Sequence, residues 1–288
     1  MKIDFHTHAF TESIADRAIK KLEALADQKA LTDGTISSLL NRFDEWGVDK
    51  GVVLTIATKP SQQKTINNWA ASIKSERIIP FGSVHFMADD WEEELERIKS
   101  LGLKGIKLHP DYQGFEIDDE KMIPIYKKCA ELGLIVMFHA GLDCVSPNHI
   151  HARPEASLRA HMLVPGMTMV LAHMGGNDMA DDVLKYLAGA DGNLFFDTSF
   201  IADRYDDSLV EEIILKHGSD RILFATDCPW CSGKAEISMI NRLNLSEADK
   251  DNIFYKNAQR LLCPPDLFKK HTIKIMSRRR TCADAATP

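Results

Sequence analysis

The sequence predicts an α/β protein built as a single (β/α)8 barrel, the TIM barrel, and two observations predict this fold. Short apolar runs alternate with amphipathic stretches along the chain. Each run is nearly continuously apolar, as in a parallel sheet buried on both faces. A chain of 288 residues, 44% of them hydrophobic, also has the size at which one barrel accounts for the whole chain.

The predicted strands are eight, and the intervening stretches have helical periodicity. Residues 91–98 and 119–132 are two such stretches, and Gly133 is placed to end the second helix. An open doubly wound sheet is the rival fold, but no glycine-rich phosphate turn follows the first strand. In chain order, the predicted strands are residues 2–6, 51–56, 79–85, 105–109, 134–139, 167–173, 193–198 and 221–227.

Two regions lie outside this alternation. Residues 9–35 separate the first strand from its own helix at 36–46, and we expect an extra helical segment there, 13–26, over the mouth of the barrel. We expect residues 1–263 to form the barrel domain. Residues 264–288 carry no strand signal and are expected to form a C-terminal extension that is partly disordered.

The composition restricts the partners and the compartment. Lys and Arg number 35 against 42 Asp and Glu, a net charge of −7, which gives no broad attraction to nucleic acid or to anionic membrane. The six cysteines are too scattered for a disulfide-stapled secreted domain. The chain shows no leader pattern, and its apolar runs are too short to cross a bilayer. We expect a cytoplasmic protein that acts on a small-molecule substrate. The sequence leaves open whether the protein forms a homodimer.

Ionisable side chains recur where the predicted strands end. Because barrel strands are parallel, these ends meet at one mouth, where barrel enzymes place their sites. A single histidine there is more often a hydrogen-bonded core residue, but six of the chain's 11 histidines share this position. Two imidazoles from the first strand, a third from the fifth and one carboxylate suit zinc or a similar cation. The residues are His6, His8, His85, Lys107, His109, His139, His173, Asp197 and Asp227.

Four motifs in chain order resemble the amidohydrolase superfamily. They are Asp4-Phe5-His6-Thr7-His8, Phe138-His139-Ala140-Gly141, Ala172-His173-Met174-Gly175-Gly176 and Ala225-Thr226-Asp227-Cys228-Pro229-Trp230. Residues 105–110 and 257–262 are similar to further segments of the same pattern. The sequence resembles the amidohydrolase-related branch, which also contains aminocarboxymuconate-semialdehyde decarboxylase and resorcylate decarboxylase. The resemblance runs from about residue 1 to 263.

The resemblance implies a catalytic metal site. It implies that His6, His8, His139 and Asp227 hold one divalent cation, with zinc as our first choice and manganese as our second, and that a binuclear site is less favoured. A bound cation would lower the pKa of its water from 15.7 to around 7. Asp227 is then placed to move the proton, and His173 to orient the water or stabilise the oxyanion.

Two functions compete on this scaffold. The leading prediction is hydrolysis of a C–N or C–O bond in a small polar substrate through metal-activated water. The alternative is non-oxidative, metal-dependent decarboxylation of an aromatic or unsaturated carboxylic acid. This reaction needs a cationic side chain that binds the carboxylate of the substrate. Candidate substrate-binding residues are Lys107, His109, Arg153 and Arg204. A TatD-like nuclease is disfavoured by the acidic charge and by the absence of a glutamate on the fourth strand.

Two further features have open interpretations. Lys107 could instead bridge two metals as a carboxylated lysine, as in binuclear members of the superfamily, or pair with an acid inside the barrel. Cys228 and Cys231 have the spacing of a redox dithiol, but they directly follow Asp227 within a barrel pattern. We interpret them as two free thiols that shape the pocket wall.

Overall fold

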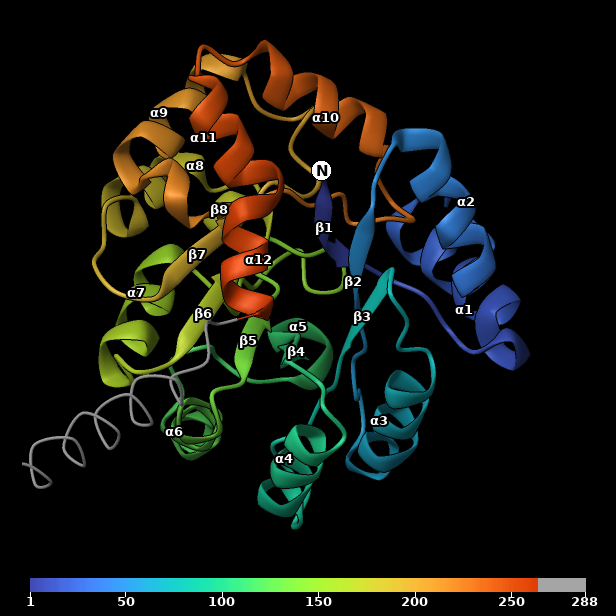
Figure 1. Cartoon of the computed structure of the whole chain (residues 1–288). Coiled ribbons are helices and arrows are strands. Elements are labelled where there is room, and N and C mark those ends of the chain that lie inside the picture. Colours follow the sequence, from blue (N-terminus) through green and yellow to red (C-terminus); the bar gives the residue numbers. More distant parts are fainter. Residues whose placement is uncertain (264–288) are drawn as a thin grey trace, which may run out of the picture.

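The computed structural model describes residues 1–263 and arranges them as parallel strands surrounded by helices (Figure 1). The extension predicted at 264–288 lies outside the described residues. Strands β1 to β3 pair in order in one parallel sheet, and β4 to β8 in a second. The strands are β1 (Ile3–Thr7), β2 (Lys50–Leu54), β3 (Ile78–Phe81), β4 (Gly105–Leu108), β5 (Ile135–Phe138), β6 (Thr168–Leu171), β7 (Leu194–Asp197) and β8 (Ile222–Leu223).

Backbone hydrogen bonds join the two sheets at both edges. Between β3 and β4, the N–H of Gly82 donates to the carbonyl of Gly105 across 2.9 Å. Between β1 and β8, the N–H of Phe5 donates to the carbonyl of Phe224 across 2.8 Å. The two sheets therefore form one barrel, as the alternation of apolar runs predicts.

The regular strands are shorter than predicted at these two seams. We expected strands at 79–85 and 221–227, whereas regular pairing ends at Phe81 in β3 and at Leu223 in β8. Beyond those residues the chain joins its neighbours through isolated bridges, Gly82 with Ile106 and Thr7 with Cys228. His85 therefore lies in a loop rather than at the end of a strand.

The helices follow the strands around the barrel. They are α1 (Glu12–Ala26), α2 (Ile36–Trp46), α3 (Gln63–Ser72), α4 (Trp91–Ser100), α5 (Pro110–Gln113), α6 (Ile123–Leu132), α7 (Pro154–Leu163), α8 (Ala180–Asp182), α9 (Asp207–His217), α10 (Gly233–Arg242), α11 (Glu247–Asp251) and α12 (Asn257–Leu262). Short 3-10 turns cover Pro60–Gln62, Glu120–Met122, His173–Gly175 and Ser219–Arg221, and π-helical turns cover Val183–Leu187 and Asn252–Lys256.

The extra helix after the first strand is α1. The segment that follows it packs on the loop after β8, where the N–H of Leu31 donates to the carbonyl of Pro229 across 2.8 Å. Helix α2 begins at a Thr35 cap, whose side chain accepts from the N–H of Ser38, and it ends at left-handed Gly47. Residues 9–35 thus bring an additional segment to the mouth of the barrel.

Alternate strand residues pack into two different apolar clusters. Val136 and Phe138 of β5 join the cluster between strands and helices. Ile135 and Met137 join a second cluster with residues of the other strands and with Leu262 of α12. Helix α12 crosses the barrel in Figure 1. Side chains therefore fill the barrel interior, which leaves the chemistry to the strand ends and the loops that follow them.

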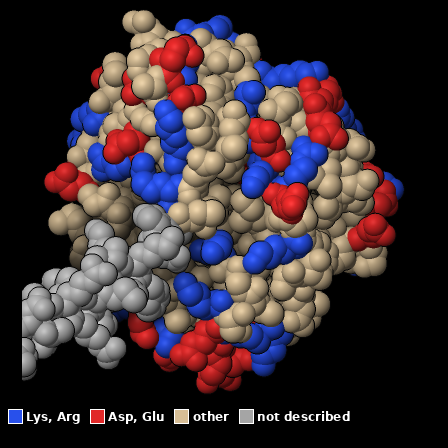
Figure 2. Space-filling model, viewed as in Figure 1, with Lys and Arg blue, Asp and Glu red and all other residues tan. Residues whose placement is uncertain are grey.

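The surface carries both signs of charge. On the face shown in Figure 2, acidic and basic side chains are intermixed between uncharged ones. Within residues 1–263, no helix combines the length and the apolar character that crossing a membrane requires.

Candidate metal centre

Two histidines and a carboxylate converge at the mouth of the barrel. His6 belongs to β1, His8 follows it, and Asp227 lies in the loop after β8. The Nε2 atoms of His6 and His8 are 3.1 Å apart. Oδ1 of Asp227 lies 3.2 Å from the first and 3.1 Å from the second. His6 and His8 are two residues apart along an extended backbone, which places their side chains on the same side and brings their nitrogens together.

The hydrogen bonds of the two imidazoles determine which ring nitrogens carry a proton and which have a free lone pair. Nδ1 of His6 lies 2.9 Å from the buried carboxylate of Asp197, and Nδ1 of His8 lies 3.3 Å from the carbonyl of Leu54. A carbonyl only accepts and an ionised carboxylate does the same, so both Nδ1 atoms carry the proton. Two Nε2 lone pairs therefore face each other and the Asp227 carboxylate, with no proton available between them.

Such a set of acceptors fits a cation. With the roughly 2.0–2.1 Å metal–nitrogen bonds of zinc, ligand atoms of a tetrahedral site lie about 3.4 Å apart, and an octahedral site brings them to about 3.0 Å. The three atoms here fall between these values. Burial, followed by the charge of Lys107, holds the pKa of His6 well below its usual range. Burial would raise the pKa of Asp227, but His6 and His8 bring it below the usual value.

His139 lies in a neighbouring cluster. Its Nε2 is 3.5 Å from Oδ2 of Asp143, and Nε2 of His109 is 3.6 Å from the same oxygen. The two rings stack with centroids 4.4 Å apart. The structure therefore groups His139 with His109 and Asp143, rather than with His6, His8 and Asp227. Its role as the fourth ligand stays a prediction.

His173 connects the two groups. Its Nε2 lies 3.2 Å from Nδ1 of His139, and its Nδ1 donates to the carbonyl of Ser199 across 3.1 Å. Its ring centroid is 5.9 Å from that of Phe200. Burial lowers the pKa of His173 to about 4. The backbones of His173, Met174, Phe200 and Asp227 all have positive φ angles, between 56° and 65°.

Lys107 projects from β4 into the same region and is 1% exposed. Its Nζ has no hydrogen-bond partner among the described residues. Burial lowers the pKa of Lys107 to about 8, although the carboxylates of Asp197, Asp227 and Asp143 oppose the shift. None of these carboxylates forms an ion pair with Lys107 within the described part of the chain, so the lysine carries a charge without a direct partner.

A family model described as amidohydrolase matches residues 3–262 of the chain. The chain belongs to the amidohydrolase family. No curated protein matches the sequence.

Solved structures share the amidohydrolase barrel over most of its length. A 2,6-dihydroxybenzoate decarboxylase from Rhizobium superposes with a TM-score of 0.69 at 18% identity, over 91% of this chain and 98% of the other. A 5-carboxyvanillate decarboxylase from Sphingomonas paucimobilis gives 0.68 at 16%, over 91% and 98%. A dihydroxybenzoic acid decarboxylase from Polaromonas, solved with manganese and 2-nitroresorcinol, gives 0.67 at 18%, over 91% and 96%. These likenesses establish the fold.

The amidohydrolase chain does not gather the two predicted arginines at the metal centre. Arg153 is exposed at the start of α7. Arg204 is exposed in the loop after β7, where it lies 3.3 Å from Asp178 and 4.1 Å from the centroid of the Phe200 ring. Arg204 therefore reaches the site only through Phe200, which contacts His173.

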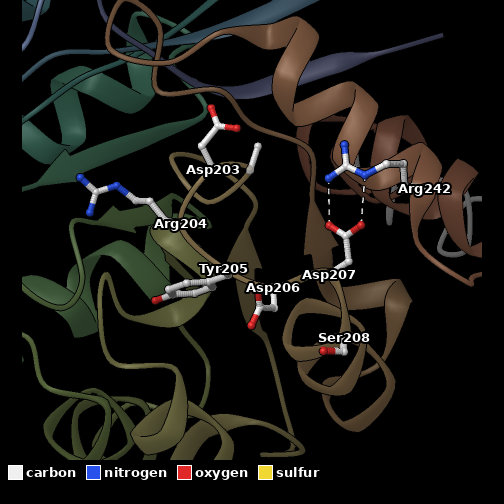
Figure 3. Close-up of a pocket in the computed structure, with 8 residues that line it drawn as sticks. Asp203, Arg204, Tyr205, Asp206, Asp207, Ser208 and Arg242 are labelled. Atoms are coloured by element: carbon white, nitrogen blue, oxygen red, sulfur yellow. Dashed lines mark hydrogen bonds and ion pairs between the residues drawn. The ribbon is translucent and has the colours of Figure 1, made fainter.

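Two hollows flank Arg204. Figure 3 shows the first, of about 580 Å³, where Arg204 lies apart from the ion pair of Asp207 with Arg242. The second, of about 430 Å³, is lined by Phe200, Arg204, Trp230, Cys231 and others. It lies between the segment after α1 and the loops after β7 and β8, and none of the predicted metal ligands lines it.

The Cys228–Cys231 pair is not a disulfide. Both thiols are free, Cys228 is buried, and Cys231 lines the second hollow. Burial raises the pKa of each thiol, which disfavours the reactive thiolate. Cys231 therefore forms part of a pocket wall, whereas Cys228 is packed in the interior and lines neither hollow.

Sequence reasoning left three residues of the amidohydrolase's site without a role. The sequence pattern marks Asp197 only as a strand end and gives Asp143 and Ser199 no role. A signal existed for Ser199, since it stands two residues after Asp197, as His8 stands after His6. Its Oγ lies 3.2 Å from Nδ1 of His6 and 3.0 Å from Nδ1 of His173.

Proposed function

We propose that this amidohydrolase is a metal-dependent decarboxylase of a small aromatic or unsaturated carboxylic acid. His6, His8 and Asp227 would hold one divalent cation, and His139 is predicted to complete the set. Several structures that share the fold over at least 96% of their length are described as decarboxylases of aromatic acids. They favour this reaction over the hydrolysis that the sequence placed first.

The observation that carries the proposal is the unpartnered ammonium group of Lys107. A buried charge without a hydrogen-bond partner is costly. A substrate carboxylate entering the mouth would supply the missing partner, through a charge-assisted hydrogen bond. The carbonyl oxygen of a neutral amide or lactone, the substrate of a hydrolase, could accept a hydrogen bond from this ammonium but would leave its charge without a counter-charge.

Different side chains at the mouth would serve different steps of decarboxylation. The carbon–carbon bond breaks, carbon dioxide leaves, and the electron pair remains on a carbon that must then take a proton. Lys107 would orient the carboxylate before the bond breaks. Asp143, whose pKa is raised by burial, is the group we assign to hold that proton between His109 and His139. A divalent cation bound nearby would supply Lewis-acid stabilisation of negative charge on the substrate oxygens.

Hydrolysis of a C–N or C–O bond is the second candidate, and the family match supports it. The nature of the ion is a further part of the proposal. The imidazole-rich donor set favours zinc, whereas one structural neighbour was solved with manganese. A binuclear site with a carboxylated Lys107 would require this lysine to lose its charge, and it would then no longer attract a carboxylate.

A parallel assay would test the proposal. Metal-free protein is reloaded with zinc or with manganese and offered hydroxylated benzoic acids, amides and lactones, while carbon dioxide release and hydrolysis are both measured. We expect metal-dependent carbon dioxide release from at least one aromatic acid, and its loss in the Asp227→Asn variant. Hydrolysis of an amide or lactone without any carbon dioxide release would contradict the proposal and restore the hydrolase.

A further inference from the structure

Glu116, His149 and His151 form a second convergent group, outside the metal centre described above. Glu116 lies in the loop that follows β4 and α5, and the two histidines lie in the loop between β5 and α7. Nε2 of His149 donates a hydrogen bond to Oε1 of Glu116 across 2.7 Å, and Nδ1 of His151 is 3.2 Å from the same oxygen. One ligand atom from each residue falls within 4.8 Å of the others. The decarboxylase proposal gives this group no task.

Backbone hydrogen bonds hold all three residues in place. The N–H of Ile117 donates to the carbonyl of His151 across 3.1 Å, which pairs the two loops beside Glu116. The carbonyl of Glu116 accepts from Asp119 across 3.0 Å, and the N–H of His149 donates to Ser146 across 3.0 Å. The backbone therefore needs no rearrangement when the three side chains bind a common partner.

Nδ1 of His151 provides an independent observation. This nitrogen is buried and has no hydrogen-bond partner among the described residues. It lies 3.2 Å from the Glu116 carboxylate, yet the two atoms do not have the geometry of a hydrogen bond. Close approach without alignment is expected of two atoms that coordinate a third, because ligands about 2.0–2.1 Å from a zinc ion lie about 3.4 Å apart in a tetrahedron.

We propose that Glu116, His149 and His151 form a second metal site, for Zn²⁺. Two imidazole nitrogens and one carboxylate oxygen are a donor set of zinc, and imidazole disfavours calcium and magnesium, which prefer oxygen ligands. Three protein ligands leave the fourth position to water. The ion would fasten the loop after β4 to the loop after β5. Because that second loop also carries Asp143, zinc at this site would restrain a residue of the mouth.

The test measures zinc binding rather than activity. Full-length protein without a polyhistidine tag is stripped of metal and titrated with Zn²⁺ against a chromophoric chelator. The variants are Glu116→Gln and His149→Ala, whose side chains are partly exposed. Glu120→Gln serves as the matched control, because Glu120 is an exposed glutamate at the start of the 3-10 turn that follows the Glu116 loop. His6→Ala reports on the other centre.

We expect Glu116→Gln and His149→Ala to lose one zinc equivalent that Glu120→Gln and His6→Ala retain. The loss of affinity should exceed the roughly 10–100-fold that removing a partner outside the ligand set causes. If Glu116→Gln and His149→Ala bind zinc with the stoichiometry and affinity of the wild type, the second site does not exist. This readout does not depend on whether the protein is a decarboxylase.

Discussion

The buried carboxylate of Asp197 accepts a hydrogen bond from Nδ1 of His6 across 2.9 Å. The other oxygen of Asp197 accepts from the backbone N–H groups of His173, across 2.9 Å, and Ser199, across 3.0 Å. One side chain therefore fixes the tautomer of a candidate ligand and the backbone of the residue predicted to act beside it. Such outer partners orient metal ligands and raise their basicity.

Asp197→Asn should weaken metal binding by roughly 10–100-fold. An amide that turned its NH2 group toward His6 would make Nδ1 an acceptor and move the imidazole proton to Nε2, where it blocks ligation. Chelator competition on the purified variant measures the effect. Asp206→Asn, an exposed aspartate of the following loop, is the control. Equal metal affinity in Asp197→Asn and the wild type would mean that Asp197 does not orient His6.

Asp227→Asn should keep the fold and reduce turnover by at least the roughly 10–100-fold that perturbing a metal site causes, because it alters a proposed ligand, and by about 10²–10⁴-fold if the reaction is a hydrolysis in which Asp227 also moves the proton. Asp227 has a φ angle of 62°, and asparagine tolerates this left-handed conformation as well as aspartate does. Circular dichroism and bound-metal analysis confirm that the variant is folded and loaded. Turnover near that of the wild type in such a sample would remove Asp227 from the mechanism.

His173→Ala should retain most of its metal, whereas His6→Ala should lose it on dialysis. Nδ1 of His173 is already committed to the Ser199 carbonyl, and its Nε2 faces His139 rather than the acceptors of His6 and His8. The metal bound per chain after dialysis is measured in both variants and compared with that of the wild type. A metal-free His173→Ala protein would make His173 a ligand. His139→Ala belongs in the same series, because metal loss in that variant would establish His139 as the fourth ligand.

Lys107→Met should remove the buried ammonium while keeping a side chain of similar length. We expect kcat/KM for a carboxylic acid substrate to fall roughly 10- to 100-fold, the effect of losing a hydrogen bond to a charged group. Stability should not fall, because no hydrogen bond of Lys107 Nζ is lost. Lys104→Met, at an exposed lysine just before β4, is the matched control. An unchanged kcat/KM in Lys107→Met would show that Lys107 does not bind the carboxylate of the substrate.

His217 should make the protein less stable in mild acid. Its buried ring stacks on Phe196 at 3.9 Å and donates from Nε2 to the carbonyl of Leu194 across 3.1 Å. Burial lowers its pKa to about 3, against about 6.5 in an unfolded chain. The stabilisation is complete above about pH 6.5, because both states are then neutral. It is lost as the pH falls toward 3, by up to about 1.4 kcal/mol per pH unit, because only the unfolded chain binds the proton.

Guanidinium unfolding of wild type and His217→Phe at several pH values isolates this contribution. Phenylalanine keeps the stacking on Phe196 and carries no titrating proton. The free energy of unfolding of the wild type should therefore fall more steeply than that of the variant, by about 2 kcal/mol between pH 6.5 and 5. Parallel pH profiles would show that His217 does not titrate on unfolding.

The barrel could be predicted because its evidence is local. A strand buried on both faces needs a continuous apolar run, and each run is visible in the sequence. The seams could not be predicted, since residues 79–85 and 221–227 are as apolar as the others. Regular pairing ends early there because the chain crosses from one sheet to the other. Gly82 bonds to Gly105 of the second sheet, and Phe224 bonds to Phe5 of the first.

The site was predictable where strands alone position it. His6, His8 and Asp227 meet because His6 lies near the end of β1, His8 just after it and Asp227 in the loop after β8, and these two strands are neighbours in the barrel. The positions of the other side chains considered for the site depend on the conformation of the loops that carry them. Asp143 faces His109 and His139 because the loop after β5 folds back toward them. Arg153 is exposed, and Arg204 lies against Asp178 and Phe200 rather than at the metal centre. No periodicity in the sequence reports such directions.

The left-handed residues at the mouth have a consequence for engineering. His173, Met174, Phe200 and Asp227 each hold a backbone conformation that costs a non-glycine residue on the order of 1 kcal/mol or more. Glycine adopts the same angles without steric cost, so replacing His173 or Asp227 with glycine would relax the backbone while removing a side chain that we propose takes part in the reaction. A library of this enzyme ranked by melting temperature would therefore enrich inactive sequences, and any thermostability campaign must select for turnover in every round.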